Sequence, residues 1–171
     1  AHRCYLGAAE LDGNNPHYLY NLASSFIFMG DLGQAEDTYS KVIALAPDHY
    51  DAWHNRSTLR KQTADDNHIR ELEQALNSLA PGHAGETALC YALAREYEDL
   101  GEYELGFAWL KRGADGHRRR LAYDVQTDVA MMQRIAELFD RAYAEKVGAA
   151  PVRPGPIFVL GLPRSGTTLV D

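Results

Sequence analysis

The sequence has little cysteine, no long hydrophobic run and no excess of positive charge, and each shortage excludes a class of protein. Cys4 and Cys90 are the only two cysteines, too few for a disulfide framework; both fall in apolar helical patterns, so we expect buried, reduced thiols. No run approaches the roughly 20 apolar residues of a transmembrane helix, which excludes a membrane-spanning chain. The net charge of −7 argues against a nucleic-acid partner.

These shortages leave an ordinary globular composition, with 46% hydrophobic and 24% charged residues. No signal peptide is visible, and we expect a cytoplasmic protein, although a chain that begins at Ala1 does not exclude a leader. The seven histidines show no metal-ligand spacing with cysteine or carboxylate residues, so we expect no metal site.

The segment 16–49 predicts two antiparallel helices. Its apolar residues recur at helical spacing before and after a break at 30–33, and Pro47 ends the second helix. Small residues, Ala23 and Ala35, stand where the two helices need to approach closely. The remaining apolar positions are Leu19, Leu22, Phe26, Tyr39, Val42 and Ile43. The segment therefore reads as a helical hairpin.

The same hairpin pattern recurs along the chain. Segment 50–83 repeats Trp53 and Pro81 in register, but Arg56 and Arg60 replace apolar residues, so this copy is degenerate. Its second helix, from Ile69, is expected to take its N-cap from 65–67. Segment 87–120 is a clearer copy, and 1–15 matches the second helix of a further one.

This spacing resembles the tetratricopeptide repeat (TPR) family. The resemblance implies an all-α solenoid over 1–120, whose concave face, formed by the first helix of each hairpin, binds a protein or peptide partner. For any single candidate face residue a merely solvated side chain is the simpler interpretation, and the mixed chemistry leaves the ligand class open. Helical phase selects Tyr20, Ser24, Ile27, Phe28, His54, Thr58, Lys61, Tyr91, Arg95 and Glu98.

Two further segments complete the helical part. Residues 121–147 keep an apolar helical phase, and we expect one long helix that caps the last hairpin. The basic cluster Lys111, Arg112 and 117–120 reads either as cations at a helix C-terminus or as a patch for an acidic ligand. Residues 148–156, with three prolines and two glycines, predict an interdomain linker.

The end of the chain predicts a phosphate-binding loop. Residues 157–160, Ile-Phe-Val-Leu, favour a buried parallel strand, and a glycine-bounded loop, 161–168, leads from it into an apolar helix start. Such a turn directs backbone N–H groups toward an anion. The glycine spacing matches the loop of nucleotide triphosphatases, but Thr167 stands in place of the lysine that contacts the outer phosphates, which argues against a kinase or NTPase.

Residues 163–168, behind the hydrophobic strand, resemble the 5′-phosphosulfate-binding loop of sulfotransferases, whose donor is 3′-phosphoadenosine 5′-phosphosulfate (PAPS). The combination resembles a bacterial TPR–sulfotransferase group. The resemblance implies that Arg164 pairs with the phosphosulfate and stabilises charge on the bridging oxygen. It also implies that PAPS is the co-substrate and that no metal is required. The implied cofactor-binding residues are Gly161, Pro163, Arg164, Ser165, Gly166, Thr167 and Thr168.

Two functions remain open at this point. The first is an enzyme in which the TPR solenoid precedes an α/β sulfotransferase domain that begins at 157–171 and transfers a sulfuryl group to a hydroxyl or amine. The family's 3′-phosphate site and acid/base residue find no counterpart in these 171 residues, so we expect the segment alone to be inactive. The alternative is a non-enzymatic TPR interaction module with a vestigial phosphate loop.

Overall fold

The computed structural model of the chain describes residues 1–147, 159 and 161, which fall into two compact units, 1–122 and the part from 123 onward. Every regular element within these residues is an α-helix, and the pair Thr63–Asp66 forms an isolated β-bridge in a loop. Among the helices described, none combines the length and the apolar character that a bilayer crossing requires. The expected all-α repeat region is therefore confirmed.

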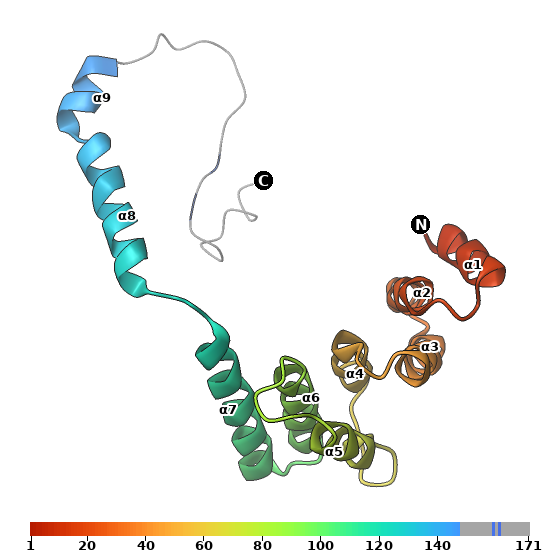
Figure 1. Ribbon diagram of the computed structural model, residues 1–171. Helices are drawn as coiled ribbons and strands as arrows, with labels where there is room; N and C mark the ends of the chain where they lie inside the picture. Colours follow the sequence, from red (N-terminus) through yellow and green to blue (C-terminus); the bar gives the residue numbers. More distant parts are fainter. Residues whose placement is uncertain (148–158, 160, 162–171) are drawn as a thin grey trace. The chain divides into compact units, whose positions relative to one another are not determined.

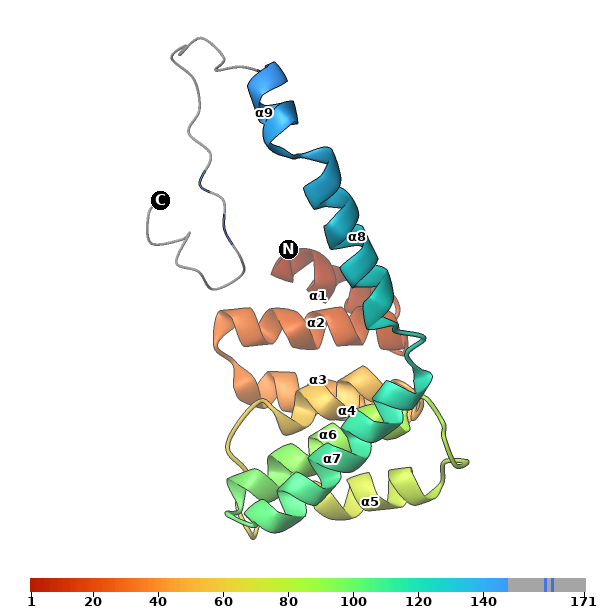
Figure 2. The ribbon, with the colours of Figure 1, turned by 90° about the vertical axis from the view of Figure 1, so that its left-hand side faces the viewer.

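Unit 1–122 consists of helical hairpins. Figure 1 shows α2, α4 and α6 following one another along one side, which we call the inner face, and α3 and α5 along the other side; Figure 2 shows the helices as stacked layers. The helices are α1 (His2–Leu11), α2 (Pro16–Met29), α3 (Leu32–Leu45), α4 (Tyr50–Ser57), α5 (Ile69–Asn77), α6 (Glu86–Asp99) and α7 (Tyr103–Arg120).

The helix ends of the first hairpin follow from local sequence. The Asn15 side chain accepts hydrogen bonds from the backbone N–H groups of His17 and Tyr18, so α2 starts with a filled N-cap. Gly30 ends α2 with φ of 78°, a left-handed conformation that suits glycine. Asp31 then caps α3 through the backbone N–H of Gln34. The expected break is thus confirmed at residues 30–31, whereas Leu32 and Gly33, which were also assigned to it, already belong to α3.

A continuous apolar core joins the hairpins. In α2 and α3 it buries Leu19, Ala23 and Tyr39, and the same cluster runs on through Trp53 of α4 and Leu93 of α6. Its other buried members are Val42, Ile43, Ala52, Leu72, Leu76, Leu89, Cys90 and Ala92. Helices α2 and α3 pack on each other, as do α6 and α7, whereas α4 packs between α3 and α6 and α5 packs on α6, so the middle helices join the stack mainly through α6.

In the third hairpin, a glycine of α7 allows close packing against α6. A Cβ atom at Gly113 would lie 2.8 Å from a ring carbon of Tyr91 and 3.0 Å from Cβ of Cys90, so only glycine permits this approach of α7 to α6. Of the larger apolar side chains of α7, Trp109 packs partly buried against the core, whereas Tyr103, Leu105, Phe107 and Leu110 are exposed. The expectation for the cysteines is half right: Cys90 is buried, but Cys4 is exposed on α1, for which α2 is the main packing neighbour among the described helices.

The second unit contains α8 (Val125–Leu138) and α9 (Arg141–Val147). The chain forms two helices where one helix over 121–147 was expected. The reason is local: the Asp140 carboxylate accepts a hydrogen bond from the backbone N–H of Tyr143, an N-cap contact that starts a new helix. The capping role stays a prediction. The linker 148–156 lies outside the described residues, as does strand 157–160 apart from Val159, which belongs to no helix or strand.

Candidate partner-binding site

The predicted face residues of the first hairpin are divided between packing and exposure. Tyr20 is half-buried, stacks on the ring of His49 at 4.6 Å and accepts a hydrogen bond of 2.9 Å from the Asn55 amide. Burial, with the nearby Tyr39 and Asp51, raises the pKa of Tyr20 above its ordinary value. Ser24 donates to the Tyr20 carbonyl and meets the Tyr39 hydroxyl. Tyr20 therefore contacts α4 directly, whereas Ser24 contacts the Tyr39 hydroxyl of α3, to which Asn55 of α4 also donates.

At the end of α2 the side chains reach solvent. Phe28 is 91% exposed, and Ile27 is also exposed. Both residues lie outside the core, and neither lines the two pockets described below. Their role in partner binding stays a prediction.

The middle hairpin departs from the prediction. Helix α4 ends at Ser57, so Thr58 and Lys61 lie after the helix, in the segment that leads to α5, and not on a helical face as expected. Both are exposed, and the Thr58 hydroxyl donates to the carbonyl of Asn55. Polar contacts surround the end of α4.

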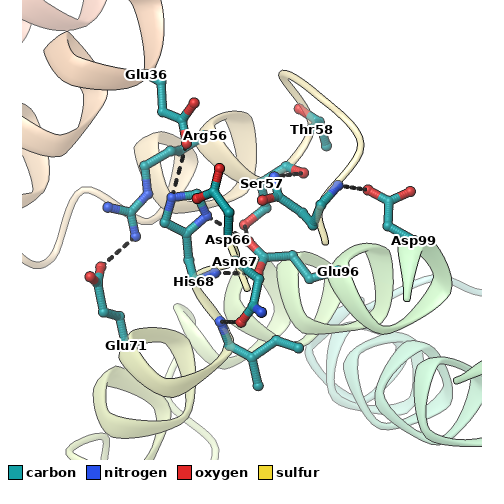
Figure 3. A network of polar contacts seen from close by, with 12 residues as sticks. Glu36, Arg56, Ser57, Thr58, Asp66, Asn67, His68, Glu71, Glu96 and Asp99 are labelled. Atoms are coloured by element: carbon teal, nitrogen blue, oxygen red, sulfur yellow. Dashed lines mark hydrogen bonds and ion pairs between the residues drawn. The ribbon is translucent and has the colours of Figure 1, made fainter. Parts of the chain in front are cut away.

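A buried carboxylate holds the end of α4 (Figure 3). Glu96 of α6 has no exposed surface, and it accepts 2.6 Å hydrogen bonds from the Ser57 hydroxyl and from the backbone N–H of His68. The His68 ring nitrogen Nδ1 lies 2.9 Å from the same carboxylate. Burial alone would raise the pKa of Glu96, but the contacts from His68 and Ser57 outweigh it and lower that pKa.

The same arrangement reaches the first hairpin. His68 Nε2 lies 3.2 Å from a carboxylate oxygen of Glu36, and Arg60 binds both oxygens of Glu36 at 2.9 Å. Arg60 also pairs with Asp66 at 2.7 Å. We call Glu36, Ser57, Arg60, His68 and Glu96 the polar cluster. It links α3, α4, α6 and the 58–68 segment, and sequence reasoning did not find it.

Arg56, the other arginine at an apolar position of the repeat, also has polar partners. Its side chain is buried, pairs with Glu71 at 2.8 Å, donates to the Ser40 hydroxyl and lies over the ring of Trp53. The start of α5 is close to the prediction. His68 occupies the N-cap position, and the Asn67 side chain accepts from the backbone N–H of Ile69.

Two pockets adjoin on the inner face, and they share His54 and Tyr91. The first, of about 410 Å³, lies between α6 and α7 and is mainly apolar. The second, also about 410 Å³, lies at the start of α6. Besides the shared pair, the first is lined by Ala94, Arg95, Glu98, Tyr103, Gly106, Phe107 and Leu110, and the second by Tyr50, Asp51, Gly85, Thr87, His117, Arg120 and the alanines 84 and 88. Four predicted face residues thus meet in one groove.

Charge is distributed unevenly along this groove. At the apolar end Arg95 pairs with Glu98 at 3.2 Å and Asp99 at 3.1 Å, so its charge is compensated. At the other end Arg120 donates to the Thr87 hydroxyl and to the carbonyl of Ala84, and it makes no ion pair with a described carboxylate. Between the ends, burial lowers the pKa of His54, against the opposing effect of Asp51.

Part of the basic cluster on α7 is already paired. Lys111 contacts Asp115 at 2.6 Å, and Arg112 contacts Glu86 at 2.8 Å and lies over the ring of Trp109. Lys111 and Arg112 thus lie in the middle of α7 with carboxylate partners, whereas the other half of the cluster, 117–120, forms the last helical turn, where cations are favoured. The segment 117–120 closes α7, and two of its residues face the second pocket.

The predicted sulfotransferase site lies outside the described residues, except for Gly161, which belongs to no helix or strand. Positions 163–168, including Arg164, therefore stay predictions. Within residues 1–147, no three His, Cys, Asp or Glu side chains gather in a way that could hold a metal ion.

Comparison with known proteins gives a repeat match and distant relatives. The tetratricopeptide repeat family matches residues 16–49, which are α2 and α3, so the chain contains at least one TPR. An Aquifex aeolicus (strain VF5) protein of unassigned function is 29% identical over 154 residues, which is 90% of this chain and 20% of that protein. This chain thus spans about a fifth of that relative's length.

A solved structure, the MamA RS-1 ArsTM double mutant, is similar with a TM-score of 0.46 and 21% identity. The similarity covers 67% of this chain and 63% of that one.

Proposed function

We propose that the hairpins of residues 1–122 form a protein-interaction module, and that a partner segment binds the inner face along α6. The observation that carries this proposal is the pair of adjoining pockets that share His54 and Tyr91. They expose apolar surface beside charged side chains, the combination that protein interfaces use for affinity and orientation. The TPR match at 16–49 supports the same function, since stacked helical repeats offer extended binding surfaces.

Site-specific photo-crosslinking tests the proposal. A benzophenone amino acid at Tyr91, in the full-length protein in its own cells, is expected to give one discrete adduct that mass spectrometry identifies. The matched control is Lys41, exposed on α3 and absent from both pockets. Adducts equal in kind and yield at both positions, or none at Tyr91 and at Arg95, contradict the proposal.

We also propose a second function for the protein of which this chain is part: sulfuryl transfer from PAPS to a hydroxyl or amine. The sequence of the loop at 161–168 favours it, with its strand-like run before, its glycines, Arg164 and the paired threonines. In this proposal Arg164 contacts the phosphosulfate, and the TPR hairpins recruit the acceptor or a partner protein.

Ligand binding by the full-length protein separates this function from a vestigial loop. Adenosine 3′,5′-bisphosphate is expected to bind without Mg²⁺, and Arg164→Ala is expected to weaken that binding at least about tenfold, because a charge-assisted contact is lost. Arg141→Ala, which removes an exposed arginine of α9, is the control and leaves binding unchanged. Binding of ATP with Mg²⁺ instead, or of neither nucleotide, contradicts the proposal.

A further inference from the structure

A groove of about 500 Å³ lies between α4 and α5 of the middle hairpin. These two helices both pack on α6. In the repeat register of about 34 residues, Ser57 and Ile69 stand where the first hairpin has Ala23 and Ala35, so the middle hairpin lacks the two alanines that let α2 and α3 approach closely. The residues of the groove that matter here are Asp48, Trp53, Glu71, Gln74, Ala75 and Leu79.

The charged side chains that line this groove are both acidic. Asp48 is exposed in the turn before α4 and makes no ion pair with a described cation. Glu71 binds Arg56 through one carboxylate oxygen, and its side chain is 57% exposed. Gln74 adds an exposed amide. The groove therefore offers hydrogen-bond acceptors and negative charge from both α5 and the turn before α4.

Two helix C-termini add to this negative charge. Helix α3 ends at Leu45, just before Pro47 of the groove, and α5 ends at Asn77, beside Ser78 of the groove. The C-terminal end of a helix carries a partial negative charge that cations stabilise. Neither α3 nor α5 has a basic residue in its last turn, whereas α7 carries His117 and three arginines there. The third hairpin thus supplies its own cations at this position, and the first two do not.

The remaining surface of the groove is partly apolar. Ala75 and Leu79 are half-buried, and Trp53 is nearly buried, with its indole N–H donating to the carbonyl of Pro47 at 3.0 Å. A lysine or arginine side chain combines an apolar stem with a charged head, so it complements a groove that is apolar at its base and acidic at its edge.

We propose that the α4–α5 groove binds a basic side chain of a partner protein. The stem lies against Ala75 and Leu79, and the charged head lies near Asp48 and Glu71. This surface is distinct from the groove along α6, so the proposal goes beyond the interaction function given above, and either of the two can fail while the other holds.

Short peptides test the proposal on the intact 171-residue chain. The probes are an acetylated and amidated Ala-Arg-Ala peptide and the same peptide with citrulline, which has the shape of arginine without its charge. Two-dimensional NMR gives the Kd from the indole N–H signal of Trp53; the signal of Trp109, which does not line the groove, is the internal control. We expect a saturable shift with the arginine peptide and binding at least about fivefold weaker with citrulline.

Matched variants test the contribution of the acidic edge. Asp48→Asn is expected to weaken the arginine peptide at least about fivefold, whereas Asp37→Asn, an exposed position of α3 outside the groove, leaves its Kd unchanged. Gln74→Arg places a cation in the groove and is expected to compete with the peptide; Gln34→Arg, also exposed on α3, is its control. Circular dichroism confirms the fold of each variant.

Three outcomes of these titrations overturn the proposal: equal binding of the two peptides, equal Kd values for Asp48→Asn and Asp37→Asn, or no saturable shift at Trp53.

Photo-crosslinking from position 74 of the full-length protein in its own cells tests the source of the side chain. We expect an adduct with another protein whose cross-linked peptide contains lysine or arginine. An adduct with this chain itself or with a second copy, or no adduct, overturns the assignment to a partner. Adducts from Tyr91 decide the inner-face function separately.

Discussion

The first and middle hairpins of the repeat differ in how their helices are held: α2 packs directly on α3, whereas α4 and α5 both pack on α6. Hairpin α2–α3 is held by apolar side chains, among them Leu19 and Tyr39, whereas the end of α4 is held by the carboxylate of Glu96. Arg56 and Arg60, which read as defects of the repeat pattern, are bound by Glu71 and Glu36. A degenerate repeat can therefore stay in the stack when neighbouring helices supply partners for its polar residues.

This difference predicts different kinds of fragility. A buried carboxylate is tolerated only while its hydrogen bonds are complete, because desolvation of the charge costs several kcal/mol. An apolar core loses stability in proportion to the volume removed. Substitutions in the two regions should therefore differ in size, in pH dependence and in the elements that they release.

The largest effect is expected from Glu96→Ala. It leaves the Ser57 hydroxyl, the backbone N–H of His68 and the His68 ring without their common acceptor. We expect a loss of about 3 to 5 kcal/mol in the free energy of unfolding. Urea denaturation followed by tryptophan fluorescence measures it, because Trp53 and Trp109 both lie in unit 1–122.

Glu98→Gln is the control for this measurement, since Glu98 lies on the same helix and its carboxylate is exposed. We expect that variant to unfold close to the wild-type midpoint. A Glu96→Ala variant as stable as Glu98→Gln would show that the polar cluster contributes nothing to the fold.

A cavity in the first hairpin is expected to lower the free energy of unfolding somewhat less than Glu96→Ala does. Leu19→Ala removes buried methyl groups from the core between α2 and α3, and we expect a loss of about 2 to 4 kcal/mol by the same urea titration. Leu11→Ala is the control, since that leucine is almost fully exposed at the end of α1. Equal midpoints for the two variants would mean that Leu19 is not part of a packed core.

The pH dependence of stability separates the two interiors. The folded-state pKa of Glu96 lies below its ordinary value near 4.5, so its stabilising contribution is complete above that value and is lost as the pH falls through the folded pKa. The stability gap between wild type and Glu96→Gln should therefore be constant down to about pH 5 and then shrink.

Leu19→Ala is the control for that titration as well, because no ionisable group is removed and its gap should not change with pH. A Glu96→Gln gap that grows as the pH falls would contradict the lowered pKa. The comparison is made by urea denaturation at each pH, with the tryptophan signal as before.

Features that depend on neighbouring residues could be predicted from the sequence, whereas contacts between residues far apart in the sequence could not. Apolar spacing at Leu19, Leu22 and Ala23 and the break at Gly30 depend on neighbours a few positions away, so the first hairpin was predictable. The contact between Ser57 and Glu96 joins residues 39 positions apart, and no local pattern marks it. The early end of α4, at the residue that makes this contact, was missed as well.

The candidate site was likewise half predictable. The helical period predicted which side of its own helix each of His54, Tyr91 and Arg95 occupies, and the structure brings the three together in one pocket. It did not find Phe107 and Leu110, whose exposure depends on the close glycine contact of α7 with α6 and on what packs beyond it. The glycines at 106 and 113 were the available signal.

The smallest loss of stability is expected from the removal of an uncharged hydroxyl in the first hairpin. The Tyr39 hydroxyl lies 3.0 Å from the Ser24 hydroxyl and accepts a 3.4 Å hydrogen bond from Asn55, so it is a neutral counterpart of the Glu96 contacts. Tyr39→Phe keeps the ring and removes only these bonds, and we expect a loss of about 1 kcal/mol that does not change between pH 3 and 8. A loss as large as that of Glu96→Ala would mean that uncharged and charged contacts stabilise the hairpins equally, and the distinction between the two interiors would fail.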